Sequence, residues 1–115
     1  MATILRALSV RQPWVELILR GSKKAEYRSR PTNIRERVFL YASLQPADWP
    51  PAWRRVRKDP GQLPTGAIVG SVELVDCRWD EAENSWAYVL RGPKRLRSPL
   101  LPKNQPQPGF WRPQF

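Results

Sequence analysis

The chain has 115 residues with one cysteine and no histidine, and its 20 Lys and Arg residues against 10 Asp and Glu give a net charge of +10. A second core would need about 100 further residues, so we predict a single domain over residues 1–115. The missing histidine excludes a Ser-His-Asp triad and a Cys/His zinc site, and the single cysteine excludes a disulfide within the chain. We therefore expect no metal and no cofactor.

The positive charge is unevenly distributed along the chain. Residues 1–58 carry 13 basic and 4 acidic side chains, residues 59–90 carry 1 and 6, and residues 91–115 carry 6 and 0. Segregated positive charge favours RNA or another nucleic acid as partner, because guanidinium groups pair with phosphate. A general compositional bias toward arginine is the alternative. No apolar run approaches the roughly 20 residues of a membrane span, so we expect a cytoplasmic monomer without a membrane partner.

The first half of the chain predicts three strands and one helix. Residues 3–10 form the first strand, and a short helix follows in which Trp14, Leu17 and Ile18 share one face. Ser9 or Gln12 is a candidate cap for this helix, and the glycine at position 21 ends it. Residues 25–30 alternate as a strand with one charged face, and residues 37–43 form a mostly apolar strand.

The second half begins with a proline-rich segment, residues 45–64, in which residues 52–58 form one or two helical turns. Residues 67–79 predict a long strand with a bulge or bend at Gly70. An acidic turn over residues 80–84 leads into a returning strand over 86–90. A turn-rich tail with six prolines follows, and Phe110 and Trp111 form a short closing strand. The predicted fold class is α+β, a small barrel of five to six strands with a helix after the first strand.

The stretch GSKKAEYR, residues 21–28, joins the helix to the charged strand. A tight link of this kind directs backbone N–H groups and the Lys23 ammonium toward one point, which makes it a candidate anion site. The alternative is a solvated turn followed by an exposed edge strand.

Aromatic and basic residues alternate in the proline-rich segment. Trp49 and Trp53 stand beside four basic side chains, and this combination suits base stacking with phosphate contact. Alternatively, the two tryptophans only attach the loop to the barrel. Trp14 is expected in the core or on the floor of a cleft, and Cys77 as an inert strand residue.

Three sequence elements resemble the ASCH domain family. They are LSVRQPW at residues 8–14, GSKKAEYR at residues 21–28 and GAIVGSVELVDC at residues 66–77, and the resemblance covers nearly the whole chain. It implies a PUA-like β-barrel with a cleft beside the first helix, and a role in binding RNA.

Some proteins that resemble this chain are enzymes. Small bacterial members hydrolyse the amide of N4-acetylcytidine with a Lys, a Thr and a Glu, and others are reported as ribonucleases. The resemblance implies that Lys23 and Glu73 match the Lys and the Glu. Glu26 stands where the Thr would fall, and a carboxylate does not replace a hydroxyl nucleophile. A histidine-free ribonuclease would use Lys23, Glu26 and Glu73, with a Glu as general base.

Three functions remain open from the sequence. The leading hypothesis is binding of RNA or a modified nucleoside in a cleft lined by Lys23, Glu26, Arg28 and Glu73. A hydrolase and a protein-interaction module that uses the basic faces are the alternatives. The candidate ligand-binding residues are Ser9, Gln12, Trp14, Lys23, Lys24, Arg28, Arg30, Trp53, Arg54, Arg55, Arg57, Arg95 and Arg97.

Overall fold

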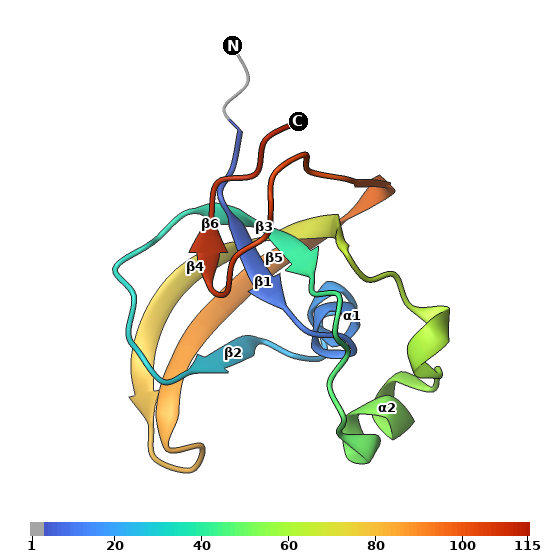
Figure 1. Ribbon diagram of the computed structural model, residues 1–115. Coiled ribbons are helices and arrows are strands. Elements are labelled where there is room, and N and C mark those ends of the chain that lie inside the picture. The colour runs from blue at the N-terminus through green and yellow to red at the C-terminus, as the bar shows by residue number, and fades with distance from the viewer. Residues whose placement is uncertain (1–3) are drawn as a thin grey trace.

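Six strands and two short helices make up the computed structural model, which describes residues 4–115 (Figure 1). The strands form one sheet in the order β2-β5-β4-β3-β1-β6, in which β1 and β3 are parallel and the other neighbours antiparallel. This confirms the predicted α+β class with a helix after the first strand. Residue 3 of the predicted first strand lies outside the described residues. The elements are β1 (Ala7–Val10), α1 (Trp14–Leu19), β2 (Ala25–Arg28), β3 (Arg37–Ala42), α2 (Pro50–Val56), the 3-10 turn η1 (Pro60–Gln62), β4 (Ala67–Asp80), β5 (Ser85–Leu100) and β6 (Phe110–Trp111).

The two ends of the sheet approach each other without pairing as strands. The Arg28 guanidinium of β2 donates a hydrogen bond of 2.6 Å to the carbonyl oxygen of Ser9 in β1. The Tyr88 ring of β5 stacks on the Phe110 ring of β6, with centroids 6.0 Å apart. The result is a barrel-like sheet with one open side, which we call the seam. Side chains rather than a backbone ladder bridge this seam.

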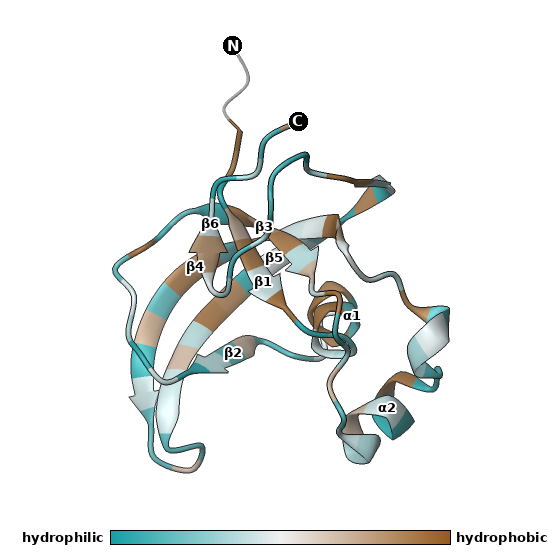
Figure 2. Ribbon diagram, viewed as in Figure 1, coloured by the Kyte–Doolittle hydropathy of each residue, from teal (hydrophilic) through white to brown (hydrophobic). Residues whose placement is uncertain are grey.

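Helix α1 forms as its sequence predicts. The Gln12 side-chain oxygen accepts a hydrogen bond of 3.0 Å from the backbone N–H of Glu16, which satisfies a donor of the first turn. Gly21 ends the helix at a φ of +81°, where a side chain would be strained. The apolar face of α1 then packs against the inner side of the sheet, where Ile18 joins Leu40 and Val72 in the main core. In Figure 2 the hydrophobic segments of α1, β4 and β5 gather at the centre of the molecule.

Helix α2 is attached by a separate small cluster. Val56 of α2 packs against Leu17 of α1 and against Leu63, just after η1. The Arg20 guanidinium, one residue past the end of α1, donates to the Val56 carbonyl oxygen at 2.9 Å. These contacts hold the basic α2 segment beside α1 (Figure 1). None of the helices in residues 4–115 has the length and apolar character needed to cross a membrane.

Strand β5 is much longer than predicted. The prediction ended this strand at residue 90 and assigned Pro93 and Pro99 to turns, yet β5 continues to Leu100 along β4. Beyond Val89 the other edge of β5 has no strand partner, because β2 pairs only with residues 86–89. A proline without an N–H is tolerated on such a free edge. The predicted bulge at Gly70 is confirmed, since the β4–β5 register shifts between Ile68 and Gly70.

Candidate functional site

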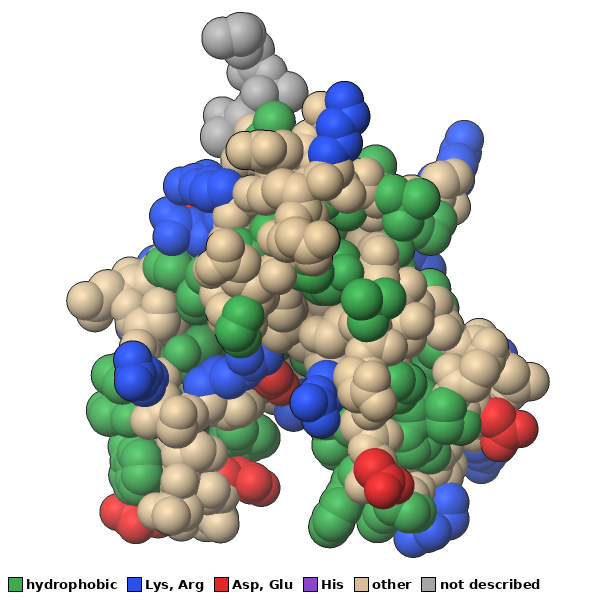
Figure 3. Space-filling view, viewed as in Figure 1, with side chains coloured by type: hydrophobic (Ala, Val, Ile, Leu, Met, Phe, Trp, Pro, Cys, Tyr) green, Lys and Arg blue, Asp and Glu red, His purple; other side chains and the backbone are tan. Residues whose placement is uncertain are grey.

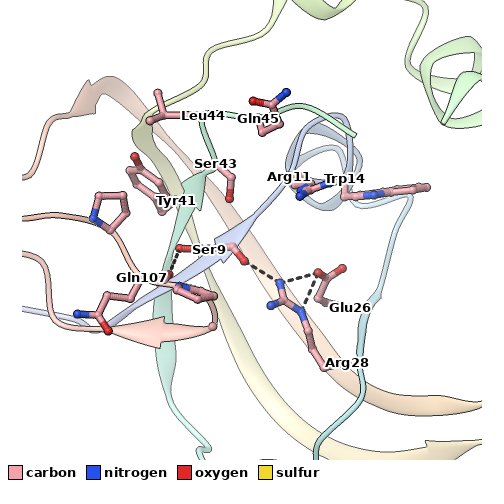
Figure 4. A pocket seen from close by; sticks show the side chains of 13 residues that line it. Ser9, Arg11, Trp14, Glu26, Arg28, Tyr41, Ser43, Leu44, Gln45 and Gln107 are labelled. Carbon is pink, nitrogen blue, oxygen red and sulfur yellow. Dashed lines mark hydrogen bonds and ion pairs between the residues drawn. The ribbon is translucent and has the colours of Figure 1, made fainter. Parts of the chain in front are cut away.

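The seam of the sheet opens into a pocket of about 510 Å³ (Figure 4). Its walls come from the end of β1, from Trp14 of α1, from β2, from the segment after β3 and from the loop before β6. We call it the seam pocket. Its lining residues are Ser9, Arg11, Trp14, Glu26, Arg28, Tyr41, Ser43, Leu44, Gln45, Pro106, Gln107, Pro108 and Gly109.

An ion cluster borders this pocket, and of its three members Glu26 and Arg28 line the pocket whereas Lys23 does not. The Glu26 carboxylate accepts hydrogen bonds of 3.1 and 2.8 Å from Nε and Nη2 of Arg28, and its other oxygen lies 3.7 Å from Nζ of Lys23. Of the predicted charged face over residues 25–30, Glu26 and Arg28 line the pocket, whereas β2 ends at Arg28 and Arg30 does not line it. Two cations surround one carboxylate, so the cluster carries a net positive charge. The second Arg28 contact, to Ser9, fixes the guanidinium across the seam.

Lys23 occupies the link between α1 and β2 that the sequence singled out. Its Nζ lies 5.1 Å from the centroid of the Trp14 ring and 4.9 Å from that of Tyr27. Burial lowers the pKa of the Lys23 ammonium, and the nearby Glu26 carboxylate acts in the opposite direction. A cation held between two ring faces and a carboxylate is oriented before any ligand arrives.

Ser9 and Gln12 take mainly structural roles. The Ser9 hydroxyl donates to the Gln107 carbonyl at 2.7 Å and accepts from the Trp111 indole at 2.9 Å, which fixes the loop that walls the pocket. Gln12 is 1% exposed, and its amide nitrogen donates to the Pro64 carbonyl at 3.0 Å. Both ends of the Gln12 amide are thus satisfied within the chain, and Gln12 does not line the seam pocket.

The structure does not bring Glu73 to the ion cluster. Glu73 lies between buried Val72 and Leu74 on β4, so its side chain points to the outer face of the sheet and is 50% exposed. There it pairs with Arg37 at 3.7 Å. The expectation that Glu73 lines the same cleft as Lys23, Glu26 and Arg28 is therefore corrected. The cause is side-chain alternation along β4, where even a one-residue register shift reverses which face a side chain occupies.

Two of the predicted arginines near the C-terminus lie outside the pocket. Arg95 makes a two-point ion pair with Glu16 at 2.8 and 2.9 Å, so it joins β5 to α1. Arg97 is exposed on β5. Arg30 is also exposed, and its carbonyl accepts the Tyr88 hydroxyl at 2.7 Å.

The predicted residues of the proline-rich segment lie on α2, except Arg57, which is the residue that follows the helix. The Trp53 indole donates to the Ala47 carbonyl at 2.8 Å and its ring packs against the α2 cluster, so it attaches the loop, as the alternative interpretation expected. Arg54 and Arg57 are exposed beside Trp53. Arg55 and Lys24 instead border a second pocket, which also includes Trp14 and Lys23.

Several pocket residues were not predicted. Arg11 lies in the LSVRQPW element, and its position between Ser9 and Trp14 could have indicated it. Tyr41, Ser43 and Gln45 come from the end of β3 and the segment after it, and Gln107 comes from the tail. The sequence carries no local signal for these residues, because the tail reaches β1 through the long-range pairing of β6 with β1.

The comparisons with known proteins agree with this architecture. Residues 8–107 match the model of the ASCH domain family, and the chain belongs to that family. It is similar to activating signal cointegrator 1 of Homo sapiens, with 36% identity over 127 residues, and of Mus musculus, with 27% identity over 127 residues. In both alignments 91% of this chain is covered, and the chain spans 22% of the relative's length.

The fold is also similar to solved structures. The ASCH protein of Zymomonas mobilis superposes with a TM-score of 0.64 at 15% identity, which covers 93% of this chain and 85% of that one. A point mutant of the same protein gives a TM-score of 0.64 and covers 96% of this chain and 90% of that one. At this identity the likeness concerns the fold.

Proposed function

We propose that this ASCH domain binds RNA in the seam pocket, with Arg28 and Glu26 as the groups that select and orient one nucleotide. Lys23 does not line this pocket and supports Glu26 through their ion pair. The observation that supports the proposal is the combination of an aromatic wall and a fixed ion cluster in one open pocket. Trp14 offers a ring beside which a base can lie, and Glu26 offers a carboxylate that can accept from a base amino group.

The basic residues around the pocket suit the phosphate backbone. Arg11 is exposed at the pocket rim, and Arg54, Arg55 and Arg57 are found on the neighbouring α2 segment. Guanidinium groups of this kind contribute affinity that does not depend on the base sequence. The geometry favours binding over hydrolysis, because Glu73 lies on the outer face and Ser9 Oγ is engaged by Gln107 and Trp111.

The test is the salt dependence of RNA affinity. We expect the affinity of a fluorescent single-stranded RNA to fall steeply between low and moderate salt, with a logarithmic slope of several units. Arg11→Ala should weaken binding several-fold and reduce that slope by about 1. The matched control is Arg112→Ala, which removes the same charge from an exposed position outside the seam pocket. Binding without a salt slope, or an equal loss for both variants, would contradict the proposal.

A further inference from the structure

A second pocket, of about 600 Å³, also has Trp14 in its lining. Ala25 and Tyr27 of β2, Glu83 of the β4–β5 turn and residues of the α2 segment border it, and we call it the aromatic pocket. Figure 3 shows this face hollowed between the end of the β4–β5 hairpin and the α2 region, with charged side chains at the inner end of the hollow. Trp14 is common to the linings of both pockets, so the two sites are adjacent.

Three aromatic rings and three cations line the aromatic pocket. The rings are Trp14, Tyr27 and Trp49; the cations are Lys23, Lys24 and Arg55, and Glu83 is the acidic side chain beside them. The Lys23 ammonium lies over two of these rings, as described above, which leaves the Trp49 ring free of that contact. Cations interleaved with aromatic rings are the composition of a groove for single-stranded nucleic acid.

The exposed side chain of Trp49 is not part of any of the hydrophobic clusters that hold residues 4–115 together. Its side chain is 55% exposed, although burying an indole would contribute to stability. Its backbone is nevertheless well held, because the Trp49 carbonyl accepts from the N–H of Ala52 at 3.0 Å and Trp53 is anchored to Ala47. An exposed ring on a fixed backbone is suited to stacking on a ligand.

We propose that the aromatic pocket receives the base of the nucleotide adjacent to the one in the seam pocket, stacked on Trp49. This inference rests on the proposed function and makes it more specific. The ligand is then single-stranded RNA of at least two nucleotides rather than a free nucleoside. A duplex does not fit, because its base faces are already stacked on one another. Lys24 and Arg55 supply positive charge for the phosphate that joins the two nucleotides.

The experiment compares ligands of increasing length on wild-type protein. A mononucleotide, the corresponding dinucleotide and tetranucleotide, and a duplex of the same sequence are titrated with the indole N–H signals followed by NMR. We expect the dinucleotide to bind at least about 5-fold more tightly than the mononucleotide, since one stacked base contributes that much or more. The Trp49 indole signal should shift with the dinucleotide and stay in place with the mononucleotide.

Trp49→Ala is the decisive variant, and Trp79→Ala is its control, because Trp79 is also exposed but lies outside both pockets. Trp49→Ala should weaken the dinucleotide about 5- to 100-fold and leave the mononucleotide unchanged. Equal affinities of the wild type for one and two nucleotides, tighter binding of the duplex, or no effect of Trp49→Ala would overturn the second subsite. Arg11→Ala distinguishes failure of the second subsite from failure of the proposed function. If Arg11→Ala leaves mononucleotide binding unchanged, RNA binding in the seam pocket is refuted too. If Arg11→Ala weakens mononucleotide binding, the seam-pocket proposal holds without the second subsite.

Discussion

At the scale of single residues, Glu16 joins three elements. Its carboxylate is within α1, 6% of the residue is exposed, and it accepts from Arg95 of β5 and, at 2.7 Å, from Arg20. Arg20 in turn donates to the Val56 carbonyl of α2. Glu16 therefore helps to position the helix that carries Trp14 and the segment that carries the arginines. Any effect of Glu16 on ligand binding is indirect, since Glu16 does not line the seam pocket.

We expect Glu16→Gln to lower the free energy of unfolding by about 2 kcal/mol at pH 7, because charged hydrogen bonds are lost. Burial opposes the charged form, but the bonds from Arg95 and Arg20 outweigh it and hold the pKa of Glu16 below its usual value near 4.5. This contribution is present above the unfolded-state pKa and is lost as the pH falls through the folded-state pKa. Chemical denaturation of the wild type and of Glu16→Gln from pH 7 to pH 3 measures this contribution to stability. The difference between them should narrow below about pH 4.5, and a constant difference would refute the assignment.

At the scale of elements, the bulge at Gly70 sets the shape of β4. A Cβ added at Gly70 would stand 2.6 Å from the Lys94 carbonyl oxygen of β5 and 2.5 Å from Leu19 of α1. The glycine thus permits close approach of β5 and of α1 at the same point.

Gly70→Ala should lower the free energy of unfolding by about 1–3 kcal/mol, since the new methyl group meets the β5 backbone at Lys94 on one side and the Leu19 side chain on the other. Gly61→Ala is the matched control, because a Cβ at Gly61 meets nothing within 4 Å. Thermal or urea unfolding of the two variants checks the difference. Equal stability of Gly70→Ala and Gly61→Ala would show that the bulge accommodates a side chain.

The elements also show which parts of the fold could be predicted from the sequence. The apolar spacing at Trp14, the Gly21 C-terminal signal and the apolar run of β4 are local, and α1 and β4 were predicted from them. The length of β5 was missed because Pro93 is typical of a break, and the free strand edge that tolerates this proline is a property of the sheet. Glu26 and Arg28 were placed on one face because β2 is regular, whereas β4 shifts register around Glu73. Arg95 meets Glu16 across 79 positions of sequence, a pairing that only the folded sheet defines.

At the scale of the whole molecule, the seam depends on the contact of Tyr88 with Phe110. We expect Phe110→Ala to lower the free energy of unfolding by about 2–4 kcal/mol, because the ring loses its stacked partner and part of the core contact. The same variant should weaken RNA binding, since β6 follows the loop at residues 106–109 that walls the seam pocket. Phe115→Ala is the control, because its exposed ring contacts Phe39 instead. Equal effects of the two substitutions would refute this role.

The open seam also places the control of pocket width in a few side chains. In a barrel closed by a continuous ladder, a change in width requires a change in strand number or register, which affects every strand. Here the seam is spanned by one guanidinium, which joins β2 to β1, and by one pair of rings, which joins β5 to β6. Substitutions at those few positions can therefore widen or narrow the opening while the hydrogen-bonded ladders from β2 through β5, β4, β3 and β1 to β6 keep their register.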